Sequence, residues 1–256
     1  RPLGTMTGNT LEDFISLLHR LRNQRLLAGL YFDEDEIFMK EEEHFSWKVK
    51  TFVDAKRRIA RRALQEIHSR DLIALDGGST TNEIAKHLGR SLRLHRLTQL
   101  RVVTNSLPAA HELLSLASEM GLEDKSEVLQ VFIAGGRVRS NTLAVVGLGN
   151  EAEENVYNLL SKLGGASICF IGANGIFDGG FTTRTLEEAQ TKKAILSSSK
   201  RRVIVTDASK FGLRQEQIFA DFDNGIEIIT VRDGFERALE QYEALLASRN
   251  TAFTYA

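Results

Sequence analysis

The stretch Ile73-Ala74-Leu75-Asp76-Gly77-Gly78-Ser79-Thr80-Thr81 decides the fold. Three apolar residues lead into an acid, two glycines and three hydroxyls, and a helical pattern follows from Asn82 to Leu88. This order predicts a strand, a tight turn and the start of a helix. Glycines let a backbone approach a ligand closely, and the first turn of a helix leaves N–H groups unpaired. We interpret Gly77–Thr81 as a phosphate cradle, with an ordinary capped turn as the alternative.

Short apolar runs alternate with helical patterns on the C-terminal side of this stretch. Further strands are predicted at Leu100–Thr104, Val128–Ala134, Ser167–Gly172, Arg202–Thr206 and Ile226–Val231. Leu143–Val146 is either a short strand or the approach to a helix. Helices are predicted at Phe52–His68, Ala109–Leu116, Glu151–Leu163, Glu187–Ser197 and Phe235–Ala247. The alternation predicts a Rossmann-like α/β fold, a mostly parallel open sheet with helices on both faces.

The residues that follow the predicted strands are mostly small or polar. They are Asp76–Ser79, Thr104–Ser106, Gly135–Arg137, Gly172–Gly175 and Asp207–Lys210. In open parallel sheets, ligands bind beyond the carboxyl ends of the strands. We therefore expect these strand ends to meet on one rim and form a binding site.

The first 44 residues differ from the rest of the chain. Thr10–Leu30 has the apolar spacing of a helix, and acid-rich Asp33–Glu43 follows it. The apolar face of this predicted helix is either a partner or dimer surface or packs on the same core. Arg1–Thr5, before Met6, is interpreted as a cloning remnant.

Composition narrows the function classes. The chain has 256 residues, 42% of them hydrophobic, and a formal net charge of -1, which argues against a strongly basic nucleic-acid module. The single cysteine, Cys169, lies in an apolar run and is expected to be buried, and a reducing cytoplasm fits this composition. No membrane span or signal peptide is found. The basic cluster Lys56–Arg62 is interpreted as a solvated helix face, with anion binding as the alternative.

A set of short motifs follows in order along the chain. They are Asp76–Thr81, Val102–Ser106, Gly135–Gly136, Gly172–Ile176, Thr182–Thr183 and Asp207–Gly212, preceded by Phe45, Lys48, Lys56 and Ile59–Ala60. With these motifs, residues 45–233 resemble the effector-sensing domain of DeoR-type bacterial transcriptional regulators. The resemblance implies a fold shared with ribose-5-phosphate isomerases and CoA-transferase-like enzymes. It also implies a phosphorylated sugar or related metabolite as effector, a homo-oligomer, and an N-terminal winged helix-turn-helix that binds DNA.

The N-terminal part departs from that family pattern. No recognition helix of the family type is found between Met6 and His44, and an acidic stretch repels DNA phosphates. We therefore expect DNA binding only where a separate DNA-binding domain is present. Either that domain is omitted from this chain or the protein lacks it, and Met6 favours a chain that naturally starts at that residue. The expected organisation is a remnant at 1–5, a helical extension at 6–44, the sensing domain at 45–233, and a C-terminal helix and tail at 234–256.

The predicted ligand site combines the cradle with the other strand ends. It comprises Asp76, Gly77, Gly78, Ser79, Thr80, Thr81, Asn105, Gly135, Gly136, Arg137, Gly172, Asn174, Asp207 and Lys210. Lys210 is the first choice of cation for the phosphate, with a surface lysine as the alternative. Asp76 and Asp207 either accept hydrogen bonds from sugar hydroxyls or cap turns. Asn105 either bonds a hydroxyl or caps the next helix.

Further cationic candidates are Arg137 and Lys193. Asn174 stands at a position where the resembled family often has Asp. An amide can donate as well as accept a hydrogen bond, whereas a carboxylate only accepts, so recognition of a sugar hydroxyl is expected to differ.

An isomerase was weighed against a sensor. Asp76, Asp207 or Glu187 offers a base for proton transfer, but the segment Thr104–Ala110 lacks the acids and lysine that related isomerases carry there. The histidines have no metal-ligand spacing. We predict a cytoplasmic, non-catalytic sensor of a phosphorylated sugar, with no cofactor and no metal. An isomerase-like enzyme and a DNA-binding repressor are the alternatives.

Overall fold

The computed structural model describes residues 30–33, 36–39, 44–122, 127–147, 151–222, 225–249 and 251–256. The helix predicted at Thr10–Leu30 lies outside these residues except for its last position. Strands β1 (Leu30–Asp33) and β2 (Glu36–Met39) pair antiparallel, in a stretch where the sequence predicted no strand. The short helix α2 (Phe45–Lys48) opens the continuous part of the fold.

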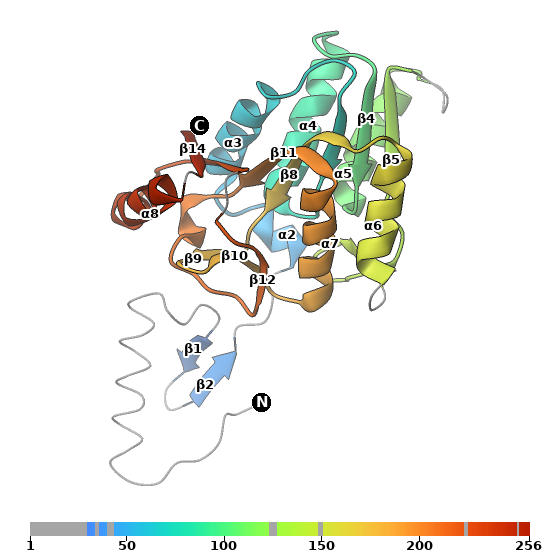
Figure 1. Cartoon of the computed structure of the whole chain (residues 1–256). Helices are drawn as coiled ribbons and strands as arrows, with labels where there is room; N and C mark the ends of the chain where they lie inside the picture. Colours follow the sequence, from blue (N-terminus) through green and yellow to red (C-terminus); the bar gives the residue numbers. More distant parts are fainter. Residues whose placement is uncertain are drawn as a thin grey trace, which may run out of the picture.

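A seven-stranded sheet forms the centre of the molecule, in the order β14-β13-β11-β8-β3-β4-β5 (Figure 1). Its strands are β3 (Leu72–Leu75), β4 (Leu100–Thr104), β5 (Leu129–Ile133), β8 (Ala166–Gly172), β11 (Ser199–Val205), β13 (Ile226–Thr230) and β14 (Ala252–Tyr255). Every neighbouring pair in it is parallel. The prediction of a mostly parallel α/β sheet is confirmed.

The strand order reverses next to β3. From β3 the chain moves outward through β4 to β5, and it then returns to place β8 on the other side of β3. At such a reversal the two connections leave the sheet in opposite directions, so the carboxyl ends of the strands are left uncovered. The region beyond Leu75 and Gly172 is therefore the expected ligand position.

Helices cover both faces of the sheet, as predicted. One face packs on α3 (Val53–Leu64), α4 (Ser79–Arg93) and α5 (Leu107–Glu119). The other packs on α6 (Glu151–Lys162), α7 (Leu186–Ser197) and α8 (Glu236–Ser248). The central strands β3, β4, β8 and β13 are mostly buried on both sides, which is why their sequences are rich in apolar residues. The edge strands β5 and β14 are partly exposed.

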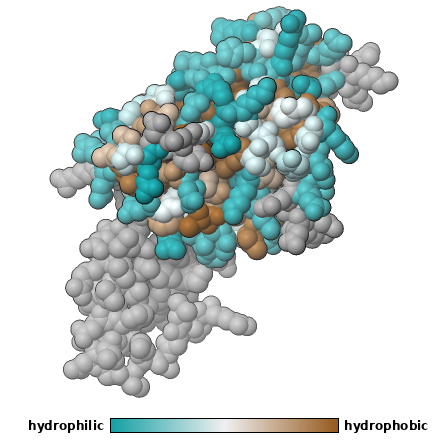
Figure 2. Space-filling view, viewed as in Figure 1, coloured by the Kyte–Doolittle hydropathy of each residue, from teal (hydrophilic) through white to brown (hydrophobic). Residues whose placement is uncertain are grey.

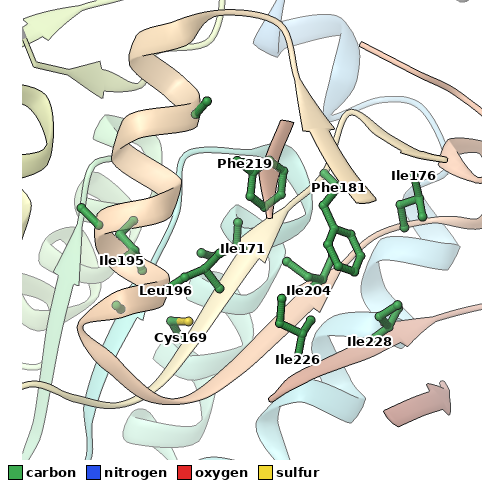
Figure 3. Close-up of a cluster of buried hydrophobic side chains, with 14 of the residues drawn as sticks. Cys169, Ile171, Ile176, Phe181, Ile195, Leu196, Ile204, Phe219, Ile226 and Ile228 are labelled. Carbon is green, nitrogen blue, oxygen red and sulfur yellow. The ribbon is translucent and has the colours of Figure 1, made fainter. Parts of the chain in front are cut away.

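Alternate residues of each strand serve opposite cores. Ile73 and Leu75 join the core under α3 and α4, whereas Ala74 joins the core under α6 and α7. Cys169 lies in the second core, among the side chains of Figure 3, as expected of a buried small apolar residue. Burial raises the pKa of its thiol to about 11.

Two smaller antiparallel elements complete the fold. Strands β9 (Gly175–Phe177), β10 (Gly180–Thr183) and β12 (Gln217–Ala220) form one sheet, and β6 (Arg137–Val138) pairs with β7 (Val145–Val146). The Leu143–Val146 region is therefore a short strand rather than a helix approach. Phe181 of β10 attaches the small sheet to the main core, because it belongs to the same buried cluster as Ile171 of β8 and Ile204 of β11 (Figure 3). Its ring lies 6.1 Å from that of Phe219 on β12 and 5.1 Å from that of Phe222.

The described surface in the view of Figure 2 is largely hydrophilic, with apolar side chains in limited patches. In the part of the chain that the structure describes, no helix is long and apolar enough to cross a membrane.

Replacing Phe181 with Ala is expected to lower the free energy of unfolding by about 3–5 kcal/mol, because the ring is fully buried and its removal leaves a cavity. Ile218→Ala on the neighbouring β12 is the control, since Ile218 is 39% exposed and should lose less than about 1.5 kcal/mol. Urea unfolding followed by circular dichroism measures both. Equal losses would show that the small sheet is not anchored through Phe181.

Candidate functional site

A polar cavity lies beyond the carboxyl ends of β3, β8 and β11. Its lining residues are Phe45, Lys48, Thr51, Lys56, Gly77, Gly78, Ser79, Thr80, Thr142, Gly172, Ala173, Asn174, Glu188, Lys192, Val205, Thr206, Asp207 and Lys210. The cavity has a volume of about 90 Å³. One ordered water needs roughly 10–15 Å³ of such volume. The cavity therefore has room for several waters or a small polar ligand.

The turn between β3 and α4 forms one wall of the cavity. The first hydrogen bond of α4 runs from Asn82 N–H to Gly78 O, so the N–H groups of Ser79, Thr80 and Thr81 precede the helical ladder. No side chain caps this end, whereas Ser106 caps α5 and Thr185 caps α7. Uncapped N–H groups together with the helix dipole favour an anion. The first turn of α4 therefore has no capping side chain, and the binding of a ligand there stays a prediction.

Close packing explains the first glycine of this turn. A Cβ at Gly77 would lie 2.6 Å from the Cβ of Ala144, so a larger residue would push the Ala144 segment away. The hydroxyl of Thr81 donates to the carbonyl oxygens of Asp76 (2.6 Å) and Gly78 (3.0 Å), which closes the turn. Thr81 is fully buried and does not line the cavity, whereas Ser79 and Thr80 do.

An ion pair between Asp76 and Lys192 lies beneath the cavity, and both side chains are almost completely buried. Lys192 also donates to the carbonyl oxygen of Gly172 (2.9 Å), and Asp76 accepts from the Gly172 N–H (3.2 Å). Burial raises the pKa of Asp76, and the attraction of Lys192 opposes that shift. Asp76 at the end of β3 is thereby tied to the end of β8 and to α7.

Glu188 stands one helical turn before Lys192 and faces the same cavity. It is paired with Arg139 and accepts a hydrogen bond from the hydroxyl of Thr183 (2.6 Å). Burial opposes its ionisation, but Lys192, Arg139 and the Thr183 hydroxyl outweigh burial and hold the pKa of Glu188 below its usual value. Glu188 is therefore a fixed carboxylate with both oxygens engaged.

Four lysines line the cavity against two carboxylates, so its charge favours an anion. These are Lys48, Lys56, Lys192 and Lys210, against Glu188 and Asp207. The ammonium of Lys210 has no hydrogen-bond or ion-pair partner among the described residues, which leaves it available to a ligand. Lys56 is 4% exposed, so its assignment to a solvated basic face was wrong.

The ends of β8 and β11 supply polar groups. Asp207 caps the turn at Ala208–Lys210 by accepting from Ser209 N–H (3.1 Å), and it also lines the cavity. Asn174 accepts from the Thr183 hydroxyl (3.1 Å). The buried Thr142 hydroxyl lines the cavity and has no hydrogen-bond partner in the described structure.

Other predicted site residues lie away from the cavity lining. Asn105 is buried and donates to the carbonyl oxygen of Val145 (3.0 Å), and Ser106 rather than Asn105 caps the next helix. Gly136 allows close contact with Val146, because a Cβ there would lie 2.3 Å from its carbonyl oxygen. Arg137 is half-exposed and pairs with Glu187 at 3.7 Å.

Gly135 and Lys193 also lie outside the lining, and Lys193 is exposed to solvent. Gly135–Arg137, which follow β5, are therefore not part of this cavity lining, and their part in binding stays a prediction.

The predicted site omitted four charged residues of the cavity lining, namely Lys48, Lys56, Glu188 and Lys192. For the last three the signal was present, because each occupies a position on the buried stripe of its helix. Lys56 precedes buried Ile59 and Ala60 by one turn, and Lys192 precedes buried Ile195 and Leu196 in the same way. A charge on a buried stripe needs a partner or a ligand. Among the described residues, no cluster of His, Cys, Asp and Glu is arranged to hold a metal ion.

Comparison with known families decides the classification. Residues 51–232 match the family described as the DeoR C-terminal sensor domain. The chain belongs to this family. The match confirms the resemblance inferred from the motifs, and it contains all the cavity-lining residues except Phe45 and Lys48.

Relatives of this DeoR-family chain are transcriptional regulators. It is 28% identical over 198 residues to a lactose phosphotransferase system repressor of Staphylococcus epidermidis, covering 77% of this chain and 70% of that protein. It is 30% identical to the HTH-type transcriptional regulator GlpR of Haloferax volcanii, covering 67% of this chain and 58% of that protein. A solved D-ribose-5-phosphate isomerase in complex with phospho-erythronic acid is similar at a TM-score of 0.41 and 18% identity, over 62% of this chain and 53% of the isomerase chain.

Replacing Lys192 with Met is expected to lower the free energy of unfolding by about 3–5 kcal/mol near neutral pH, because it leaves the Asp76 carboxylate buried without its cation. The loss should shrink as the pH falls. Without Lys192, the pKa of Asp76 in the folded state lies further above its value in the unfolded state. Protonation of Asp76 at low pH then stabilises the folded variant, and this stabilisation is lost as the pH rises through the folded-state pKa.

Denaturant unfolding at about pH 5 and about pH 8 measures this difference. The double variant Asp76→Asn/Lys192→Met is the control and should recover part of the loss at the higher pH. A loss that is the same at both pH values would contradict the role given to Asp76.

Proposed function

We propose that the cavity binds a phosphorylated sugar or a related phosphorylated metabolite as the effector of a transcriptional regulator. The observation that carries this proposal is the uncapped start of α4 opposite an unpartnered lysine. Three N–H groups and the hydroxyls of Ser79 and Thr80 offer donors to a phosphate, and Lys210 offers a compact positive charge.

The rest of the cavity suits a polyhydroxylated group. Asp207 and Glu188 are acceptors, Thr142 is an unpartnered hydroxyl, and Asn174 offers an amide. A ligand with one dianionic end and several hydroxyls satisfies these groups together. The names of the relatives fit this ligand class, since they include a lactose phosphotransferase system repressor and a glycerol-3-phosphate regulon repressor of Escherichia coli.

We further propose that the bound effector is not converted. A base that moves a proton works best with a pKa near the working pH. Glu188 has a lowered pKa and engages both oxygens, and Asp76 lies beneath the cavity in its ion pair. Asp207 uses one oxygen to cap its turn. None of the three is arranged as a mobile base, which argues for a sensor over an isomerase.

The same proposal includes regulation of DNA binding, through a DNA-binding domain that lies outside residues 44–256. The predicted lack of a helix-turn-helix between Met6 and His44 falls largely outside the described residues, and homo-oligomerisation also stays a prediction.

Glucose 6-phosphate, fructose 6-phosphate and glycerol 3-phosphate form the test panel. A ligand at about 100 times its Kd should stabilise the protein by about 2.7 kcal/mol in thermal unfolding. Lys210→Met should weaken binding by about 10- to 100-fold, because a hydrogen bond to a charged group contributes about 1.5–3 kcal/mol. Thr80→Val should weaken it by about 2- to 10-fold, since it removes one hydroxyl without changing the shape.

Lys200→Met is the matched control, because Lys200 is exposed at the opposite end of β11 and should leave affinity unchanged. Equal weakening by Lys200→Met would indicate a nonspecific charge effect. Conversion of a panel compound, followed by NMR, would favour the isomerase alternative.

A further inference from the structure

Part of the cavity wall comes from α2, which precedes the matched sensor domain. Phe45 and Lys48 of α2 line the cavity, and Thr51 lines it just after the helix. The family match begins at residue 51, so α2 joins the sensor domain to the N-terminal part of the chain. A ligand in this cavity therefore contacts the junction directly.

The packing of α2 differs from that of the rest of the wall. None of its four residues is buried, and Trp47 is 59% exposed. The cradle, by contrast, rests on β3 and on the start of α4, where Leu75 and Thr81 are fully buried. With so little buried apolar surface, α2 costs less free energy to move than the fully buried end of β3.

Polar contacts link α2 to the cavity. The Phe45 N–H donates to the carbonyl oxygen of Asn141 (2.7 Å), next to cavity-lining Thr142. The ammonium of buried Lys56 donates to the carbonyl oxygens of Lys48 and Thr51, the latter at 2.6 Å. The carbonyl oxygen of Asn141 and the ammonium of the lining residue Lys56 therefore both bond to α2 or to the residues just after it.

Charge links the same helix to the opposite wall. The positive charge of Lys48 contributes to the lowered pKa of Glu188, together with the larger effects of Lys192 and Arg139. A dianion placed in the cavity would attract Lys48 further, because opposite charges attract more strongly in a partly buried cavity than in bulk water. Ligand binding therefore acts on Lys48 as well as on the cradle.

We propose that α2 is the element that transmits occupancy of the cavity to the N-terminal part of the chain, with Lys48 as its effector-sensing residue. This inference rests on the proposed function. The dianion draws Lys48 inward and holds α2 against the wall, and the segment joined to His44 changes position with it. The ligand biases this equilibrium because its contact with Lys48 exists only when α2 is docked.

Trp47 is the only tryptophan of the chain, so its fluorescence reports on α2. The experiment titrates the full chain with the same three phosphorylated compounds, and calorimetry measures binding separately. We expect acrylamide quenching of Trp47 to decrease as ligand is added. The midpoint of this decrease should coincide with the midpoint of the calorimetric titration. Calorimetric binding with unchanged Trp47 quenching would overturn this proposal while leaving the proposed function intact. No binding of any panel compound would overturn both.

The variant Lys48→Met separates coupling from affinity. At a saturating concentration of ligand it should lose the Trp47 response, although the cradle and Lys210 still bind. Lys50→Met is the matched control, because Lys50 is exposed just after α2, and it should keep the full response. A full response in saturated Lys48→Met would overturn the role of Lys48.

Hydrogen exchange of residues 44–52 in the unaltered chain gives a second measurement that needs no substitution. Exchange in this segment should slow when ligand is bound, and an unchanged rate in the bound state would overturn the transmission through α2.

Discussion

The buried ion pair between Asp76 and Lys192 is the interaction on which the site depends. It joins the end of β3, the end of β8 and the middle of α7, which are far apart in sequence. Burying two charges is unfavourable unless additional hydrogen bonds complete them, and Gly172 supplies one to each partner. The pair thus fixes the distance between the ends of β3 and β8, the two strands between which the strand order reverses. The cavity lies next to these two strand ends.

This arrangement also supports the proposal that the bound effector is not converted. Asp76 is balanced by Lys192, and Glu188 is balanced by Lys192 and Arg139. Each carboxylate is oriented by partners that would have to be released before it accepted a proton from a substrate. A catalytic site keeps a base poised near the working pH, whereas a binding site benefits from fixed charges that need no rearrangement. The geometry favours recognition.

Most of the sheet and part of the site followed from the sequence. The strands β3, β4, β8 and β13 and the second half of β11 are apolar and mostly buried on both faces, and β5 is an apolar run at the edge of the sheet. Apolar runs of this kind can be recognised in the sequence. β14 was missed because Ala252–Tyr255 is short and gains its order by pairing with β13. Gly135–Arg137 were predicted at the rim but are not part of the cavity lining, since a strand end with small residues has the same sequence pattern whether it faces a ligand or, as Gly136 does, a neighbouring backbone.

Charged residues on helices were the harder part of the site to predict. Lys56 and Lys192 lie on apolar stripes, yet each also belongs to a run of basic residues that resembles a solvated face. Only the tertiary packing shows that Lys56 is turned inward while Arg57 and Arg61 border a different surface hollow with Arg90. An apolar pattern of period 3.6 predicts which side of a helix is buried, but only to within about one residue. An error of one residue decides whether a lysine is predicted to face solvent or a ligand.

The same distinction between rigid and weakly packed parts bears on how a sensor can respond. A ligand shifts a conformational balance only through contacts that differ between two states. The cradle cannot supply that difference, because Gly77 is locked against Ala144 and Thr81 is bonded within its own turn. A wall that buries none of its side chains can, provided that it also carries charge toward the ligand. Helix α2 meets both conditions through its exposed packing and Lys48, so a phosphate bound as proposed at the cradle would exert its conformational effect on α2.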